Sequence, residues 1–311
     1  MSIKVKSARF FFGQLIALFL ITLSAPGRII SVTPSADTTL IETAPTNNLG
    51  GSTFFNGGSN LATNRNRGLL KFNLASQIPA GSRIRTVTLS LNVVHQGIDM
   101  PSLAVFHLHR MLRDWGEGNK SNSNSPGQGL PATTSEATWM KPFALTTNSW
   151  SQPGGRANSD FAAAVSAEQE IRDPNGSPYF FLSTPVMVAD VQSWSDDPRS
   201  NFGWMLLPAD ETIPATAKRF ASREDTNYPP VLTIEFIPPP KLSDSQIINQ
   251  RLQFSFAAEP NQSYLVQFQN TLSLAASWFT LTNLPASNAA TNAAISDPAG
   301  NSQRFYRVIA P

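Results

Sequence analysis

The sequence predicts an all-β protein: a jelly-roll-like β-sandwich followed by a small sandwich of the immunoglobulin or fibronectin kind. Three observations predict this fold class: apolar and polar residues alternate in several segments, turn-forming residues are abundant, and helical periodicity is scarce. Charged residues make up only 14% of the chain, against about 25% in ordinary soluble proteins. Many short strands separated by turns are typical of sandwiches.

The strands follow from a period of two. In the clearest segment, Val87, Leu89 and Leu91 point to one side, while threonine and serine side chains point to the other. This pattern predicts strands with one buried face. It is found over residues 68–74, 83–94, 104–108 and 231–236.

A single short helix interrupts the strands. Val188, Val191 and Trp194 are spaced by three, which places them on one helical face. The sequence Asp196-Asp197-Pro198 predicts where this helix ends.

Residues 1–27 have the layout of a secretory signal peptide. Basic residues come first, residues 10–23 are almost continuously apolar, and the small residues Ser24, Ala25 and Gly27 follow. The alternative is an uncleaved membrane anchor, but the run is shorter than the roughly 20 residues that span a bilayer. We therefore expect a secreted or cell-envelope protein with no membrane span after cleavage.

Prolines divide the rest of the chain. Residues 237–241 contain three consecutive prolines, which cannot continue a strand ladder and form a stiff spacer. The predicted domains are therefore a sandwich over residues 28–236, the linker over 237–241, and a small sandwich over 242–311.

Charge and cysteine content exclude several function classes. Residues 1–27 hold three of the 23 basic residues and none of the 21 acidic ones, so the remaining chain has a net charge of −1. A nearly neutral chain argues against a nucleic-acid partner. Because the chain has no cysteine, disulfides, thiolate catalysis and cysteine-ligated metals are excluded.

The order of short motifs over residues 36–236 resembles the DNRLRE domain, also classed as carbohydrate-binding module family ninety-six. Residues 67–73 read Arg-Gly-Leu-Leu-Lys-Phe-Asn, where the family usually has Arg-Ser-Leu-Leu-x-Phe-Asp. The other matching pieces are residues 36–38, 47–50, 78–84, 115–118, 137–139, 190–194, 201–204, 220–224 and 229–232.

This resemblance implies a β-sandwich of secreted bacterial proteins, often attached to polysaccharide-active enzymes. Some members of the family bind acidic polysaccharides, and membership does not imply catalysis. Residues 242–311 are similar to the short sandwich-like tails of large secreted bacterial proteins.

The residues themselves contain no recognisable catalytic motif. There is no nucleophile elbow, phosphate loop or zinc-binding His-Glu-x-x-His. Two adjacent acid pairs remain as candidates for acid–base chemistry. We interpret Asp196-Asp197 as a turn or cap, and Glu224-Asp225 as an ion-pair partner of Arg223.

The candidates for glycan contacts are one tryptophan, two arginines and two histidines. Trp150 lies in a polar loop, where an exposed indole could stack on a sugar ring. Arg65 and Arg67 could bind carboxylates through their planar guanidinium groups, with ordinary surface pairing as the alternative. We expect the other tryptophans, namely Trp115, Trp139, Trp194, Trp204 and Trp278, to pack in the cores.

Two histidines and a few side chains with oxygen donors are candidate metal ligands. His107 and His109 are two apart on a predicted strand, and their parity suggests the solvent side. They could hydrogen-bond a sugar, but no third metal ligand can be named. Asp37, Asn47 and Asn48 offer oxygens for structural calcium, although no calcium loop is recognisable. We therefore assign no cofactor and no metal site.

The sequence thus predicts a secreted, non-catalytic protein that binds an extracellular polysaccharide, with an acidic one as the expected class. The alternative is a structural or adhesive cell-envelope protein that binds other proteins. A polysaccharide lyase or hydrolase is a third hypothesis.

Overall fold

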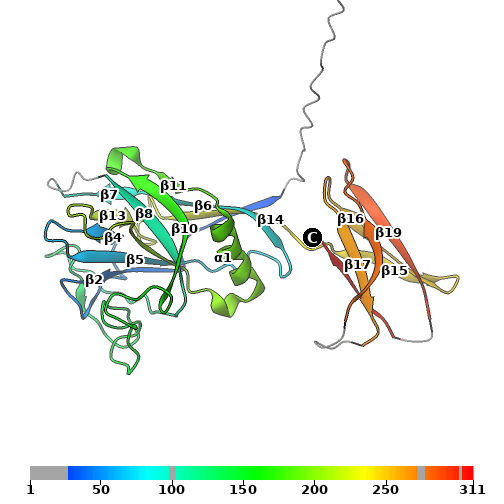
Figure 1. Ribbon diagram of the computed structural model, residues 1–311, viewed down its shortest axis with the longest axis horizontal. Coiled ribbons are helices and arrows are strands. Elements are labelled where there is room, and N and C mark those ends of the chain that lie inside the picture. The colour runs from blue at the N-terminus through cyan, green and yellow to red at the C-terminus, as the bar shows by residue number, and fades with distance from the viewer. Residues whose placement is uncertain (1–26, 98–102, 272–276, 301–302, 311) are drawn as a thin grey trace, which may run out of the picture. The chain divides into compact units, whose positions relative to one another are not determined.

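A computed structural model describes residues 27–97, 103–271, 277–300 and 303–310, and it confirms the predicted all-β sandwich fold (Figure 1). The chain divides into two compact units, Gly27–Pro239 and Pro240–Pro311, at a point inside the predicted proline linker. The predicted signal peptide lies outside the described residues, except for Gly27. Within the described residues, no helix has the length and apolar character needed to cross a membrane.

Two large antiparallel sheets form the body of the first unit. The smaller sheet has the order β1 (Arg28–Val32), β14 (Val231–Ile237), β6 (Arg83–Leu91) and β11 (Tyr179–Phe181). The larger sheet has the order β10 (Phe161–Ile171), β8 (Ala104–Met111), β12 (Trp204–Pro208), β5 (Arg65–Lys71), β4 (Phe54–Ser59), β13 (Lys218–Ala221) and β7 (Val93–His95), and β2 (Ala36–Ile41) pairs with β5. The short strands β3 (Asn47–Asn48) and β9 (Leu130–Pro131) form a separate pair.

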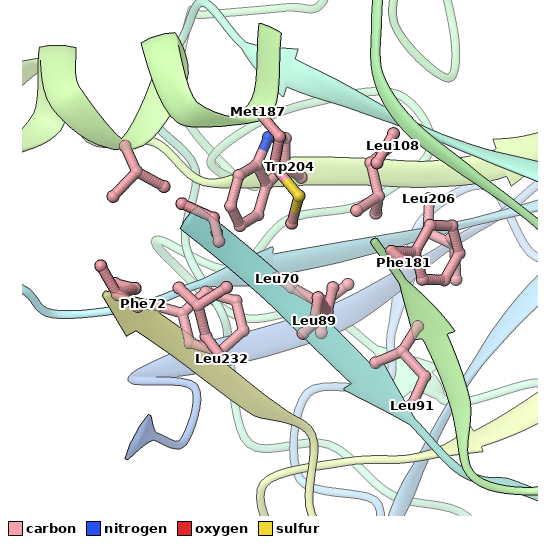
Figure 2. Close-up of a cluster of buried hydrophobic side chains, with 14 of the residues drawn as sticks. Leu70, Phe72, Leu89, Leu91, Leu108, Phe181, Met187, Trp204, Leu206 and Leu232 are labelled. Carbon is pink, nitrogen blue, oxygen red and sulfur yellow. The ribbon is translucent and has the colours of Figure 1, made fainter. Parts of the chain in front are cut away.

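The main core lies between these two sheets, as Figure 2 shows. The alternating residues of β6 point into it, as the period of two predicts. They meet apolar side chains from the opposite sheet and from the helix. The labelled members are Leu70, Phe72, Leu89, Leu91, Leu108, Phe181, Met187, Trp204, Leu206 and Leu232.

A second core covers the other face of the larger sheet. The segment between β8 and β10 places Trp115, Trp139 and Trp150 against Leu69 and Met205. Strand β12 is therefore buried on both faces, and all five of its residues are buried. This burial explains why the sequence of β12 is a continuous apolar run rather than an alternating one.

The helix α1 (Pro185–Asp196) confirms the predicted short helix and its end. The Thr184 side chain caps its first turn by accepting a hydrogen bond from Met187 N. Asp197 follows as the cap of the 3₁₀ turn Pro198–Ser200, so the interpretation of this acid pair as a cap is confirmed. A further 3₁₀ turn spans Pro174–Gly176.

The second unit contains two antiparallel sheets of three strands. One has the order β15 (Leu242–Ile248), β16 (Arg251–Ala258) and β19 (Thr291–Pro298); the other has β18 (Phe279–Leu284), β17 (Tyr264–Gln269) and β20 (Phe305–Ile309). Its core contains Phe254, Phe256, Tyr264, Val266 and Ile295. The expectation that Trp278 packs in the core was wrong: it is only half-buried, with the Arg307 guanidinium 4.2 Å from its ring centroid.

Candidate functional site

A polar pocket lies over one end of the larger sheet, where β4, β13 and β7 run side by side (Figure 1). The strand register sets Arg219 opposite Asn56 on one side and opposite His95 on the other. Because cross-strand partners share a face of a sheet, these three side chains form a row. The volume of the pocket is about 260 Å³.

A loop from the sequence between β8 and β9 forms one wall of this pocket. Pro126, Gly127 and Gln128 line it. The loop is organised by Asn122, whose Nδ2 donates to Gly129 O at 2.9 Å and whose Oδ1 accepts from Ser125 N at 3.0 Å. Such an Asn-centred turn gives a defined shape to a segment that has no strand ladder.

Arg219 is the main charged group of the pocket row. Its Nη2 donates to Pro126 O at 2.7 Å, and its guanidinium lies 4.5 Å from the ring centroid of Phe54. Among the described residues it forms no ion pair, and burial lowers the pKa of its guanidinium, which still remains charged. The described lining residues include no aspartate or glutamate. The row can therefore offer an uncompensated positive charge to a ligand.

Two amide side chains extend the polar lining. Within the described residues, the only hydrogen bond of the Asn56 side chain is a long one to the loop, from Nδ2 to Gly127 O at 3.4 Å. Gln96 Oε1 is buried and accepts no hydrogen bond within the part of the chain that the structure describes. Amides, imidazole and guanidinium are the polar groups with which proteins bind sugar hydroxyls and carboxylates.

The sequence reasoning did not identify this row. Arg219, Asn56 and His95 lie far apart in the chain, and none stands in a local pattern that indicates binding. The nearest signal was the loop over residues 121–129, which is rich in serine, asparagine and glycine. Functional side chains are often carried by such loops.

The expected exposure of Trp150 was wrong. Its side chain is 4% exposed, and its Nε1 donates to Thr138 O at 2.9 Å inside the second core. The polar residues next to Trp150 in the sequence predicted a surface position, but the whole segment folds back onto the sheet. The indole cannot act as a stacking platform in this conformation.

The two predicted arginines are engaged within the protein. Arg67 is buried, and its guanidinium binds Glu211 through Nε at 2.8 Å and Nη2 at 2.5 Å. Arg65 is one-third exposed and binds Glu42 in the same two-pronged manner. The surface-pairing alternative therefore describes Arg65, whereas Arg67 forms a buried ion pair. Both guanidinium groups also flank the Trp139 ring.

The histidines do not share the solvent side, so that expectation was wrong for His109. His109 is buried next to Phe161, and its Nδ1 lies 2.9 Å from Ala162 O. Burial lowers the pKa of His109, which favours the neutral ring. His107 is partly exposed, with its Nε2 3.3 Å from Glu168. Among the described residues, no group of three potential metal ligands includes these imidazoles.

Three carboxylates from distant segments meet at a second location. One oxygen each from Asp37, Glu117 and Glu224 lies within 4.8 Å of the other two. Arg223 lies among them: its Nε is 3.0 Å from Glu224 Oε1, its Nη2 donates to Glu117 Oε2 at 2.9 Å, and its backbone N donates to Asp37 Oδ2 at 2.7 Å. The predicted pairing of Arg223 with Glu224 is thus confirmed. Carboxylate oxygens suit calcium, so this group could hold a cation.

The predicted calcium donors are arranged differently. Asn48 directs its Oδ1 to Gly50 N and its Nδ2 to the Glu117 and Ala137 carbonyls. Asn47 donates to Gln128 O. Sequence reasoning therefore found Asp37 but missed Glu117 and Glu224, although all three lie in motifs that carry the family resemblance. Only the folded chain brings those motifs together.

Asp37 provides a test of the electrostatics in this group. Its carboxyl is 1% exposed, and burial raises its pKa well above the ordinary value, with a smaller contribution from the neighbouring glutamates. A raised pKa in the folded state means that stability falls as the pH rises from the ordinary pKa through the raised one. We expect Asp37→Asn, which keeps an acceptor for Arg223 N, to be more stable than the native protein at neutral pH.

This difference should shrink toward zero as the pH falls below the ordinary aspartate pKa. Urea unfolding in EDTA at about pH 7 and about pH 3 measures it. A variant that is less stable at both pH values would contradict the expectation.

Comparisons with known proteins add little to this description. No family model matches the chain, and no curated relative matches it. Among solved structures, the chain is similar to a β-1,2-glucanase from Parabacteroides distasonis, with 11% sequence identity over 92% of this chain and a TM-score of 0.18. The chain covers 34% of the length of that structure. A TM-score this low supports no argument, so the resemblance to the DNRLRE domain stays a prediction.

Proposed function

We propose that this protein is a secreted, non-catalytic carbohydrate-binding protein, and that it binds an acidic polysaccharide at the polar pocket over β4, β13 and β7. One observation carries the proposal: the pocket combines amide side chains and an imidazole with a guanidinium that has no acidic partner among the described residues. A uronic acid residue presents hydroxyls and one carboxylate, which are the partners these groups lack.

Arg219 would bind the carboxylate. A guanidinium meets a carboxylate with two parallel hydrogen bonds, and its stacking on Phe54 fixes the plane of the fork. Asn56 and Gln96 would contact hydroxyls from either side. This assignment replaces Trp150 and Arg67, whose side chains are buried.

The first test is affinity electrophoresis of residues 28–311 through gels that contain neutral or uronic-acid polysaccharides. We expect retardation only in the uronic-acid gels, with no fall in the viscosity of the polymer. Free migration through every gel would overturn the proposal. A fall in viscosity would instead indicate a polysaccharide lyase or hydrolase.

The second test replaces the guanidinium. Arg219→Gln should weaken polysaccharide binding by about tenfold or more, because a charge-assisted, two-pronged contact is lost. Arg199→Gln is the matched control, since the Arg199 side chain is 90% exposed on a remote 3₁₀ turn. Equal affinities of the two variants, with equal urea midpoints, would remove Arg219 from the site.

A structural or adhesive role remains the second candidate, because of one feature of the C-terminal unit. Strand β15 is an edge strand of its sheet, and all seven of its residues are exposed, including Ile247 at 70%. An exposed edge can accept a strand from another protein. Recovery of envelope proteins by the native chain, but not by a variant with Ile247→Lys, would favour this role.

A further inference from the structure

A second hollow lies between α1 and β10, which are neighbours in Figure 1. Its volume is about 350 Å³, and it is separate from the polar pocket, with which it shares no lining residue. The two ends of the hollow differ in chemistry. Its lining residues are Arg110, Ala162, Ala164, Ser166, Pro185, Val186, Ala189 and Asp190.

The polar end is electrically balanced. The Asp190 side chain is almost fully buried, and its Oδ1 lies 3.1 Å from Arg110 Nε. Asp190 Oδ2 accepts from Ser166 Oγ at 2.5 Å and from Trp204 Nε1 at 3.0 Å. The carboxylate is thus surrounded by donors, and it neutralises the charge of Arg110.

Arg110 still has a donor to offer. Its side chain is one-third exposed, its Nη1 has only a long contact of 3.5 Å to Ser193 Oγ, and its Nη2 has no hydrogen-bond partner within the described residues. Because the ion pair is already formed, this edge of the guanidinium suits a neutral acceptor such as a carbonyl oxygen. A free anion would be repelled by the adjacent Asp190 carboxylate.

The apolar end is small and carries mainly methyl groups. Ala162, Ala164 and Ala189 contribute one methyl each, and Pro185 and Val186 complete the wall. A bare sugar ring would leave its hydroxyls without partners against this wall, which is unfavourable. A methyl or short alkyl group would instead gain favourable apolar contact.

A carbonyl oxygen next to a methyl group matches both ends at once. We therefore propose that the hollow between α1 and β10 binds a short acyl group, such as the acetyl group of an O-acetylated or N-acetylated sugar. The inference rests on the proposed function, since it takes the ligand to be a glycan. The protein would then bind acyl substituents in this hollow and carboxylates at Arg219 in the polar pocket.

Alanine methyl groups supply a direct probe of this hollow. In the whole protein labelled with ¹³C at alanine methyls, Ala162, Ala164 and Ala189 report the hollow, whereas Ala217 reports the polar pocket. The probes are methyl 2-acetamido-2-deoxy-β-glucopyranoside and methyl β-glucopyranoside, which differ in the acetamido group. We expect saturable shifts of the three methyls with the acetamido sugar alone, at a dissociation constant of about 10 mM or lower.

A matched pair of variants checks the location. Ala189→Leu places a larger side chain in the hollow and replaces neither member of the ion pair, and it should abolish the shifts of Ala162 and Ala164. Ala163→Leu makes the same change at an exposed neighbour that does not line the hollow, and should preserve them. Equal shifts with both sugars, no shift with either, or persistence of the shifts in Ala189→Leu would overturn the inference.

The failure of this inference can be distinguished from the failure of the proposed function. If uronic-acid gels retard the protein but the acetamido sugar does not move the three methyls, only the acyl site is wrong. If no gel retards the protein, the polysaccharide proposal fails regardless of the methyl shifts.

Discussion

Replacement of Arg67 by methionine should lower the free energy of unfolding by about 3–5 kcal/mol, because it breaks a buried ion pair from one side. Arg67 is 5% exposed as a whole residue, and its guanidinium donates to both carboxylate oxygens of Glu211. It also donates from Nη1 to Gly154 O at 2.8 Å and to Gly155 O at 2.9 Å. Removal of the arginine leaves one carboxylate and two carbonyls without these donors.

Arg65→Met is the matched control for this prediction. Arg65 has the same two-pronged contact, to Glu42, but its side chain is 32% exposed. Partly exposed ion pairs are screened by solvent, so we expect a loss of about 1 kcal/mol or less. Urea unfolding measures both variants. Similar losses for Arg65→Met and Arg67→Met would contradict the assignment of Arg67 to the interior.

The double variant Arg67→Met with Glu211→Gln refines the test. It removes the uncompensated charge while the two glycine carbonyls still lack their donor. We expect it to recover part of the lost stability relative to Arg67→Met. No recovery would mean that the loss comes from packing or from the carbonyls rather than from the buried charge of Glu211.

Trp150→Ala should also cost about 3–5 kcal/mol, the usual range for loss of a large aromatic side chain from a core. The indole packs in the second core with Trp139 and Phe161, and its Nε1 has a hydrogen bond to Thr138 O. The substitution opens a cavity on the face of the larger sheet that the segment between β8 and β10 covers.

Glycan binding by the Trp150→Ala variant distinguishes a core role of Trp150 from the hypothesis that its indole stacks on a sugar. The folded Trp150→Ala protein should keep the native affinity for polysaccharide, because Trp150 does not line the polar pocket. Trp150→Phe, which keeps a ring but loses the indole donor, should cost about 1–3 kcal/mol. Lost binding with unchanged urea midpoints in Trp150→Ala would restore the platform hypothesis.

Local patterns predicted much of the fold because they record which faces are buried. The alternation of Val87, Leu89 and Leu91 predicted the inward face of β6, and the spacing of Val188, Val191 and Trp194 predicted α1. A strand or helix with one buried face must repeat apolar residues at its own period. These features therefore need no knowledge of the rest of the chain.

The candidate site was far less predictable. Exposure of Trp150 was expected from its polar neighbours, and carboxylate binding was expected from two arginines before a strand. The first expectation depended on where the long segment between β8 and β10 would lie, and it lies on the second face of the larger sheet. The second depended on which distant acidic side chains would reach the two guanidinium groups. Glu211 and Glu42, which occupy the two arginines, are separated from them by 144 and 23 residues.

Composition and local periodicity were enough to predict the all-β class, the helix, the position of the proline spacer and the exclusion of cysteine chemistry. Which polar side chains bind other parts of the protein, and which can bind a ligand, depends instead on how distant segments pack together. Strand pairing aligns Asn56, His95 and Arg219 in one row. Two loops, which carry Glu117 and Glu224, meet Asp37 of β2 around a single arginine. These contacts join segments that are distant in the chain, and no local sequence pattern encodes which segments pair.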